Sequence, residues 1–141
     1  MSERNVELHR LLIGAINAGD IEWITAHGDP QAEFHTAFTA VGGGVYHGHD
    51  GVRKWHREFR DVWGDEFRVE PEAYFDFGDQ TLAFIVARGR GKQSGAEVAM
   101  PAAQVARWRD GLCAFFKAYR HREDALTELG VYEDGLEPIE P

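Results

Sequence analysis

Apolar side chains recur every three or four positions in the first part of the chain, which predicts amphipathic helices. Over residues 6–18 the repeat forms one stripe, made by Leu8, Leu11, Leu12, Ala15 and Ile16. Gly19 ends this helix, and Asp20 can cap a short second helix over residues 21–26. A third helix opens at residues 49–51 and carries its stripe on Val52, Trp55, Phe59, Val62 and Trp63.

Beyond Gly64 the pattern changes from helical to alternating, which is typical of β-strands. Alternation over residues 67–77 places six residues on one face: Phe67, Val69, Pro71, Ala73, Phe75 and Phe77. Further strands are expected over residues 81–91, 97–109 and 112–121, joined by turns at residues 77–80 and 109–111. The same criteria predict a strand over 32–38, a loop over 41–45 and a last helix over 122–129.

This order of elements predicts an α+β fold, in which a cone-shaped, strongly curved antiparallel sheet wraps around three N-terminal helices. A cone leaves a cavity between the concave face of the sheet and the helices, where ligand pockets usually form. We expect residues 1–131 to form a single domain. Residues 132–141 hold four acidic residues and two prolines, and we expect this tail to be loose or draped on the surface.

Composition narrows the function classes. The chain has 141 residues, which is enough for one domain, and 24 acidic against 15 basic residues give a net charge of −9. That charge argues against nucleic-acid binding. No apolar run approaches the ~20 residues of a membrane span, and the polar N-terminus lacks a signal-peptide pattern, so the expected location is cytoplasmic. A single cysteine, Cys113, excludes an internal disulfide.

Seven short motifs follow one another along the chain. They are NAGDIE at residues 17–22, EFHT at 33–36, YHGHDGV at 46–52, FGDQ at 77–80, SGAE at 94–97, RDG at 109–111 and REDALTELG at 122–130. Their order and spacing resemble the SnoaL-like proteins of the nuclear transport factor 2-like superfamily, over residues 5–131. The resemblance implies the cone fold and a homodimer formed through the sheet face. The superfamily contains ketosteroid isomerases, polyketide cyclases, dehydratases and epoxide hydrolases, together with binding modules that catalyse nothing.

Two residues are candidates for catalysis because of this resemblance. His35 stands at the strand position where the ketosteroid isomerases carry their aspartate base, and an imidazole can take a proton near neutral pH. Gln104 resembles the position of a protonated aspartic acid, and its amide could donate a hydrogen bond to a carbonyl oxygen. The structural alternatives are a buried, hydrogen-bonded histidine and a core glutamine bonded to a neighbouring strand.

Other features of those enzymes do not carry over to this sequence. Leu12 stands where the isomerases carry a tyrosine on the first helix. Arg107 and Asp76 do not assemble the aspartate–arginine–aspartate relay of the epoxide hydrolases. The loop histidines His47 and His49, together with His56, could hold a metal only if three or four ligands converged, so we predict no metal site.

We expect the cavity to take an apolar small molecule without a cofactor. The side chains expected to contact it are Leu12, Tyr46, Trp55, Phe59, Tyr74, Met100, Phe116 and Tyr119. Three functions stay open at this point. The chain is an isomerase-, cyclase- or dehydratase-type enzyme with His35 as base, a ligand-binding module, or a structural dimer whose own aromatic residues fill the cavity. The number of polar side chains that converge near His35 distinguishes them.

Overall fold

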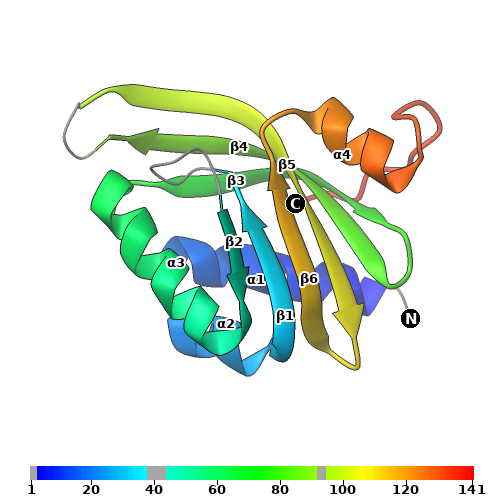
Figure 1. Ribbon diagram of the computed structural model, residues 1–141. Coiled ribbons are helices and arrows are strands. Elements are labelled where there is room, and N and C mark those ends of the chain that lie inside the picture. Colours follow the sequence, from blue (N-terminus) through cyan, green and yellow to red (C-terminus); the bar gives the residue numbers. More distant parts are fainter. Residues whose placement is uncertain (1–2, 38–43, 92–94) are drawn as a thin grey trace.

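A computed structural model describes residues 3–37, 44–91 and 95–141 of the chain, which form helices α1 to α4 and strands β1 to β6 (Figure 1). In chain order the elements are α1 (Glu3–Ala18), α2 (Ile21–Ala26), β1 (Gly28–Thr36), β2 (Gly44–His47), α3 (Gly48–Trp63), β3 (Arg68–Asp76), β4 (Gln80–Arg90), β5 (Glu97–Arg109), β6 (Leu112–Tyr119) and α4 (Arg122–Leu129). The predicted α+β class is confirmed.

The strands form one curved, unclosed sheet in the order β2-β1-β6-β5-β4-β3. The long strands β3 to β6 are antiparallel neighbours, as predicted, and β1 pairs antiparallel with β2 but parallel with β6. Figure 1 shows α1 and α2 behind the sheet, α3 beside them and α4 at the other face. None of the helices among the described residues is long and apolar enough to cross a membrane.

Strand β2 corrects the predicted loop over residues 41–45. Gly44 and Val45 already belong to this strand, which pairs with β1 through Phe34 opposite Tyr46 and His35 opposite Val45. A strand of four residues is too short to show the alternation that identifies longer strands. Residues 41–43 of that loop, and the expected end of the first strand at residue 38, lie outside the described residues.

The sheet is packed on both faces. On the concave face, α1, α2 and α3 enclose apolar residues such as Ile13, Val69 and Phe116. On the other face, α4 covers a second cluster that includes Phe84, Val105 and Leu126. Burial on both faces explains why residues 81–85 of β4 are all buried instead of alternating.

A β-bulge in β3 corrects the predicted face of that strand. Pro71 pairs with Ile85 and Ala73 with Phe84, so the residue between them, Glu72, has no partner in the ladder. The extra residue reverses the alternation. Tyr74 therefore joins the concave core with Val69, whereas Ala73, Phe75 and Phe77 pack beneath α4.

The buried face of α1 is also rotated from the predicted stripe. The helix buries Val6, His9, Leu12, Ile13 and Ala15, whereas Leu11 keeps 47% of its surface exposed. The spacing of Val6, His9 and Ile13 is itself helical, and it places a histidine in the centre of the face that meets the sheet.

The tail is draped along the edge of the sheet, which was one of the two expected outcomes. Ile139 exchanges two backbone hydrogen bonds with Tyr74 of β3, at 2.8 and 2.7 Å. The Arg10 guanidinium donates to the Glu140 carbonyl oxygen at 2.8 Å and lies over the Tyr74 ring. The tail therefore joins the edge strand to α1.

Candidate functional site

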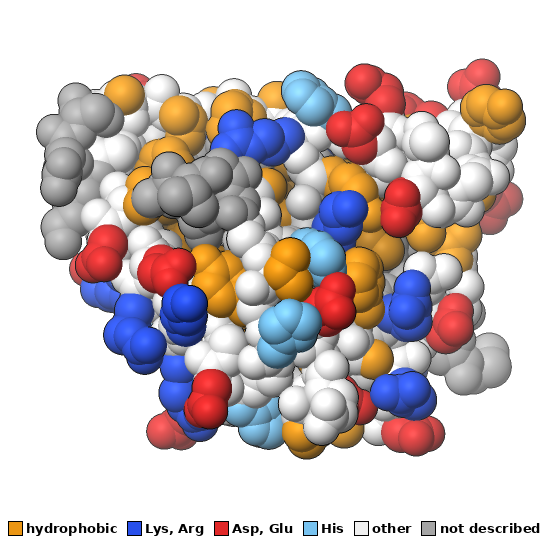
Figure 2. Space-filling model, viewed as in Figure 1, with side chains coloured by type: hydrophobic (Ala, Val, Ile, Leu, Met, Phe, Trp, Pro, Cys, Tyr) orange, Lys and Arg blue, Asp and Glu red, His pale blue; other side chains and the backbone are white. Residues whose placement is uncertain are grey.

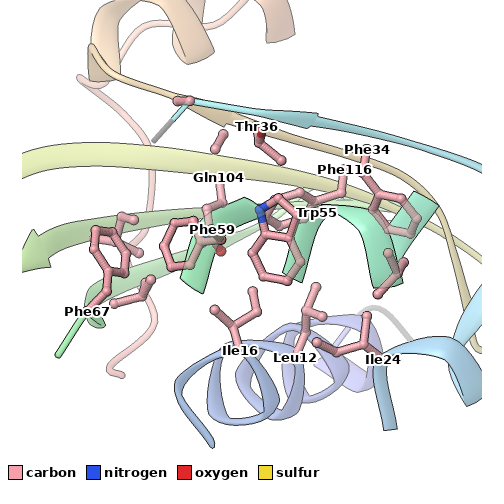
Figure 3. Close-up of a pocket in the computed structure, with 15 residues that line it drawn as sticks. Leu12, Ile16, Ile24, Phe34, Thr36, Trp55, Phe59, Phe67, Gln104 and Phe116 are labelled. Carbon is pink, nitrogen blue, oxygen red and sulfur yellow. The ribbon is translucent and has the colours of Figure 1, made fainter. Parts of the chain in front are cut away.

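A cavity lies between the concave face of the sheet and helices α1 to α3 (Figure 3). The centre of a water molecule can move within about 70 Å³ of it. Apart from Thr36 and Gln104, every lining residue is aliphatic or aromatic. Of the side chains predicted to contact a ligand, Leu12, Trp55, Phe59 and Phe116 line it.

Two N–H groups face this hydrocarbon surface. Gln104 is 3% exposed and lines the cavity, and Trp55 reaches into the same space from α3 (Figure 3). Within the described part of the chain, neither the Gln104 amide nitrogen nor the Trp55 indole nitrogen hydrogen-bonds to another residue. With no acceptor from the described residues, these two N–H groups are available to a ligand in the cavity.

The other end of the Gln104 side chain is held by a buried polar chain that runs through α1. Gln104 Oε1 lies 3.1 Å from His9 Nε2, and His9 Nδ1 lies 2.8 Å from Thr81 Oγ1. The Trp108 indole N–H donates to the same Thr81 oxygen at 2.9 Å. These hydrogen bonds join β4, β5 and α1 behind the cavity wall.

His9 is fully buried, and burial lowers its pKa to about 4 although the bond to Gln104 opposes the shift. The imidazole is therefore neutral at neutral pH and carries one ring hydrogen. His9 was not among the predicted site residues. The helical spacing of Val6, His9 and Ile13 was the available signal, since it predicts a histidine on a buried helix face.

The expectation that His35 points into the cavity is wrong. Its neighbours Phe34 and Thr36 line the cavity, and successive side chains of a strand point to opposite faces. The His35 ring lies on the outer face, 2.5 Å from Glu33 Oε1 and with its centroid 5.2 Å from that of Phe115. The structure therefore separates His35 from Gln104.

Four other predicted contact residues lie outside the cavity lining. The Tyr46 hydroxyl donates to Glu58 at 2.8 Å, and Tyr74 is packed edge-on against His9. Met100 packs against the core cluster that contains Tyr74. Tyr119 lies on the opposite face beneath α4. Each belongs to a strand of the sheet, where position along the strand and pleat decide which residues reach the cavity.

The two loop histidines and the cysteine lie outside the cavity lining. His49 donates to the Gly28 carbonyl oxygen at 3.0 Å, whereas His47 is exposed. Burial raises the pKa of the Cys113 thiol to about 12, which leaves it unreactive at neutral pH. Among the described residues, no group of three or more histidine, cysteine or acidic side chains is placed to hold a metal ion.

Comparison with known sequences matches residues 9–116 to the SnoaL-like domain family. The chain belongs to this family. The match extends from His9 to Phe116, so it includes the four residues of the buried polar chain and most of the cavity wall. No curated protein sequence matches this SnoaL-like chain.

Solved structures share the fold of this SnoaL-like chain. A nuclear transport factor 2-like protein of unknown function from Burkholderia pseudomallei is 20% identical, with a TM-score of 0.75 over 90% of this chain and 97% of that one. A putative SnoaL-like polyketide cyclase from Jannaschia is 14% identical, with a TM-score of 0.74 over 90% and 92%. TerC, co-crystallised with polyporic acid, is 21% identical, with a TM-score of 0.73 over 89% and 97%. At these identities the likeness establishes the fold alone.

Proposed function

We propose that this SnoaL-like domain binds a largely apolar small molecule that carries a hydrogen-bond-accepting oxygen. The observation behind the proposal is the cavity, whose hydrocarbon lining is interrupted by the N–H groups of Gln104 and Trp55 and by the Thr36 hydroxyl. Burying an apolar skeleton there is favourable, and the two donors would orient the oxygen. The relative co-crystallised with polyporic acid is consistent with a small-molecule site in this fold.

The lining of the cavity favours ligand binding without a chemical reaction. No titratable side chain is among the described residues that line it, so no group is placed to remove a proton from a bound molecule. The His35 imidazole lies on the other face of the sheet, and His9 reaches the cavity only through Gln104. We therefore favour the binding module over the enzyme.

A cavity-filling variant tests this proposal. Ala118 lines the cavity, and Ala118→Leu adds three carbons to its wall. Ala99 is an exposed alanine on β5, so Ala99→Leu is the matched control. The probes are aromatic ketones of increasing size, and binding is measured as a rise in Tm. A ligand at 100 times its Kd stabilises the folded state by about 2.7 kcal/mol, which raises Tm by roughly 5–10 °C.

We expect the rise in Tm for the wild type and Ala99→Leu, and its loss in Ala118→Leu. His35→Ala is expected to keep the full rise, because its ring lies outside the cavity. The proposal fails if no ketone raises Tm, or if Ala118→Leu binds as well as the wild type. Chemical conversion of a bound ketone would restore the enzyme hypothesis.

Dimerisation through the outer sheet face is a separate proposal. Figure 2 shows apolar and histidine side chains together with charged ones on this face. Val45 is 51% exposed there, and the half-buried Phe115 lies beside His35. Sedimentation of the wild type and of Val45→Glu tests it: the variant should be lighter, and equal masses would contradict the proposal.

A further inference from the structure

We propose that His9, Thr81 and Trp108 fix the orientation of the Gln104 amide, so that its NH₂ group and not its oxygen faces the cavity. The cavity then favours ligands whose polar group is a pure hydrogen-bond acceptor, such as a ketone or quinone carbonyl. This inference rests on the proposed function, because it takes the cavity as the ligand site. His9, Thr81 and Trp108 act as positioning residues, since they reach the ligand only through Gln104.

Trp108, the first residue of the buried polar chain, determines which group donates in each of its hydrogen bonds. An indole N–H can donate a hydrogen bond but cannot accept one, so Trp108 must donate to Thr81 Oγ1 at 2.9 Å. The Trp108 side chain is 4% exposed and Thr81 is fully buried. Water therefore does not compete for either group.

The Thr81 hydroxyl hydrogen determines which nitrogen of His9 accepts a hydrogen bond. Within the described residues, the hydroxyl oxygen has two hydrogen-bond partners, the Trp108 donor and His9 Nδ1 at 2.8 Å. The hydrogen is satisfied only if Thr81 donates to Nδ1. Nδ1 then accepts, and the single ring hydrogen of the neutral imidazole lies on Nε2.

His9 in turn orients Gln104. The Nε2–H group donates to Gln104 Oε1 at 3.1 Å, which leaves the amide NH₂ facing the cavity. With the amide reversed, Gln104 would have to donate to Nε2, and Nδ1–H would have to donate to Thr81. The Thr81 hydroxyl hydrogen would then be buried without a partner, which is costly. Only the first arrangement pairs the donors of Trp108, Thr81 and His9 together.

Because the Gln104 NH₂ group always faces the cavity, the cavity distinguishes ligands by their polar group. A carbonyl oxygen accepts from the NH₂ group and brings no donor of its own. An alcohol of the same skeleton also accepts, but the fixed amide presents no oxygen to its O–H hydrogen, and lining side chains such as Ile16 and Phe59 are hydrocarbon. An unpaired buried donor weakens binding by about 10- to 100-fold.

Three probes with one skeleton test the selectivity: acetophenone, 1-phenylethanol and ethylbenzene. Dissociation constants are measured by titration of the full chain at pH 7. We expect the wild type to bind the ketone about 10- to 100-fold more tightly than the alcohol. Thr81→Val keeps the shape of the side chain but removes the hydroxyl, so the ratio should fall below about 3 while ethylbenzene binds as before. Thr81→Ser restores the hydroxyl and should restore the ratio.

The tautomer of His9 gives a readout that does not depend on a ligand. The ¹⁵N chemical shifts of the imidazole should show hydrogen on Nε2 in the wild type and Thr81→Ser, and a mixture in Thr81→Val. Hydrogen on Nδ1 in the wild type would overturn the inference, as would equal affinities for ketone and alcohol when ethylbenzene binds. If none of the three probes binds, the proposed function fails as well, and the two failures are thereby distinguished.

Discussion

At the scale of single residues, His9 shows how burial of a titratable side chain affects both binding and stability. Its pKa is about 4 in the folded chain, against 6.5 for an exposed histidine, because the charged form loses its hydration. The neutral imidazole keeps one ring hydrogen, so it accepts from Thr81 at one nitrogen and donates to Gln104 at the other. The hydrogen bonds from Trp108 to Gln104 therefore all run in one direction. Burial thus keeps His9 neutral, and the neutral ring can hold the Gln104 amide in one orientation.

The lowered pKa of His9 predicts a loss of stability in acid. Between pH 6.5 and pH 4 the unfolded chain binds a proton at this position and the folded chain does not, so the free energy of unfolding falls as the pH falls. The loss is complete below pH 4 and amounts to about 3 kcal/mol. Urea unfolding at pH 7 and pH 4 measures it.

His9→Phe is the control for this pH dependence. The pKa of His56 is also lowered, by burial and by Arg60, and acts in the same direction in both proteins. The decrease in unfolding free energy from pH 7 to pH 4 should therefore be about 3 kcal/mol smaller in His9→Phe than in the wild type. An equal decrease in the two proteins would show that His9 does not titrate as described.

Tyr119 presents the opposite situation, a buried polar atom that nothing satisfies. Its hydroxyl has no hydrogen-bond partner within the described part of the chain, and burial, with Glu128 and Asp124 adding to it, raises its pKa to about 12. Tyr119→Phe removes this unpaired group and keeps the ring beneath α4. We expect the free energy of unfolding to stay the same or rise by about 1 kcal/mol. A loss of more than 1 kcal/mol in urea unfolding would contradict this.

At the scale of elements, β3 shows how the open edge of the sheet is protected. The Asn17 side chain pairs with both the N–H and the C=O of Val69, at 2.7 and 2.9 Å. Pro71 has no N–H to offer, and Tyr74 pairs with Ile139 of the tail. Unpaired groups on an edge strand are a template for a second chain, and these contacts cover them.

Removal of residues 132–141 should expose part of this edge. The deletion uncovers the backbone groups of Tyr74 and removes the contact of Arg10 with Glu140. We expect a lower Tm and greater self-association, measured by sedimentation velocity over a range of concentrations. Ile139→Pro, which removes one backbone donor, should show the same change to a smaller degree. If the shortened chain behaves like the full chain, the tail does not protect the edge.

The predictability of the elements follows from their length. Long periodic segments, such as those that form α3 and β5, are predicted within a few residues, because many side chains report the same period. The bulge at Glu72 was not predictable, because one inserted residue reverses the faces of β3 without changing its composition. Strand β2 is too short to show a period.

At the scale of the whole molecule, the site depends on contacts between distant parts of the sequence. His9 is 72 residues from Thr81 and 95 from Gln104, so no local pattern brings the three together. Gln104, selected from the sequence as a catalytic candidate, and Trp55 and Phe116, selected as ligand contacts, line the cavity, because the resemblance supplied the fold that brings them together. It misplaced His35, because which of two alternate faces a strand turns inward depends on how the helices pack against it.

A structure of the chain with bound acetophenone would show where the ligand lies and what its carbonyl oxygen contacts. We predict that the ketone lies in the cavity, with its carbonyl oxygen about 3 Å from Gln104 Nε2 or Trp55 Nε1 and its ring among Leu12, Phe59 and Phe116. A ketone bound on the outer face beside His35, or one in the cavity with its oxygen turned away from both nitrogens, would contradict the account.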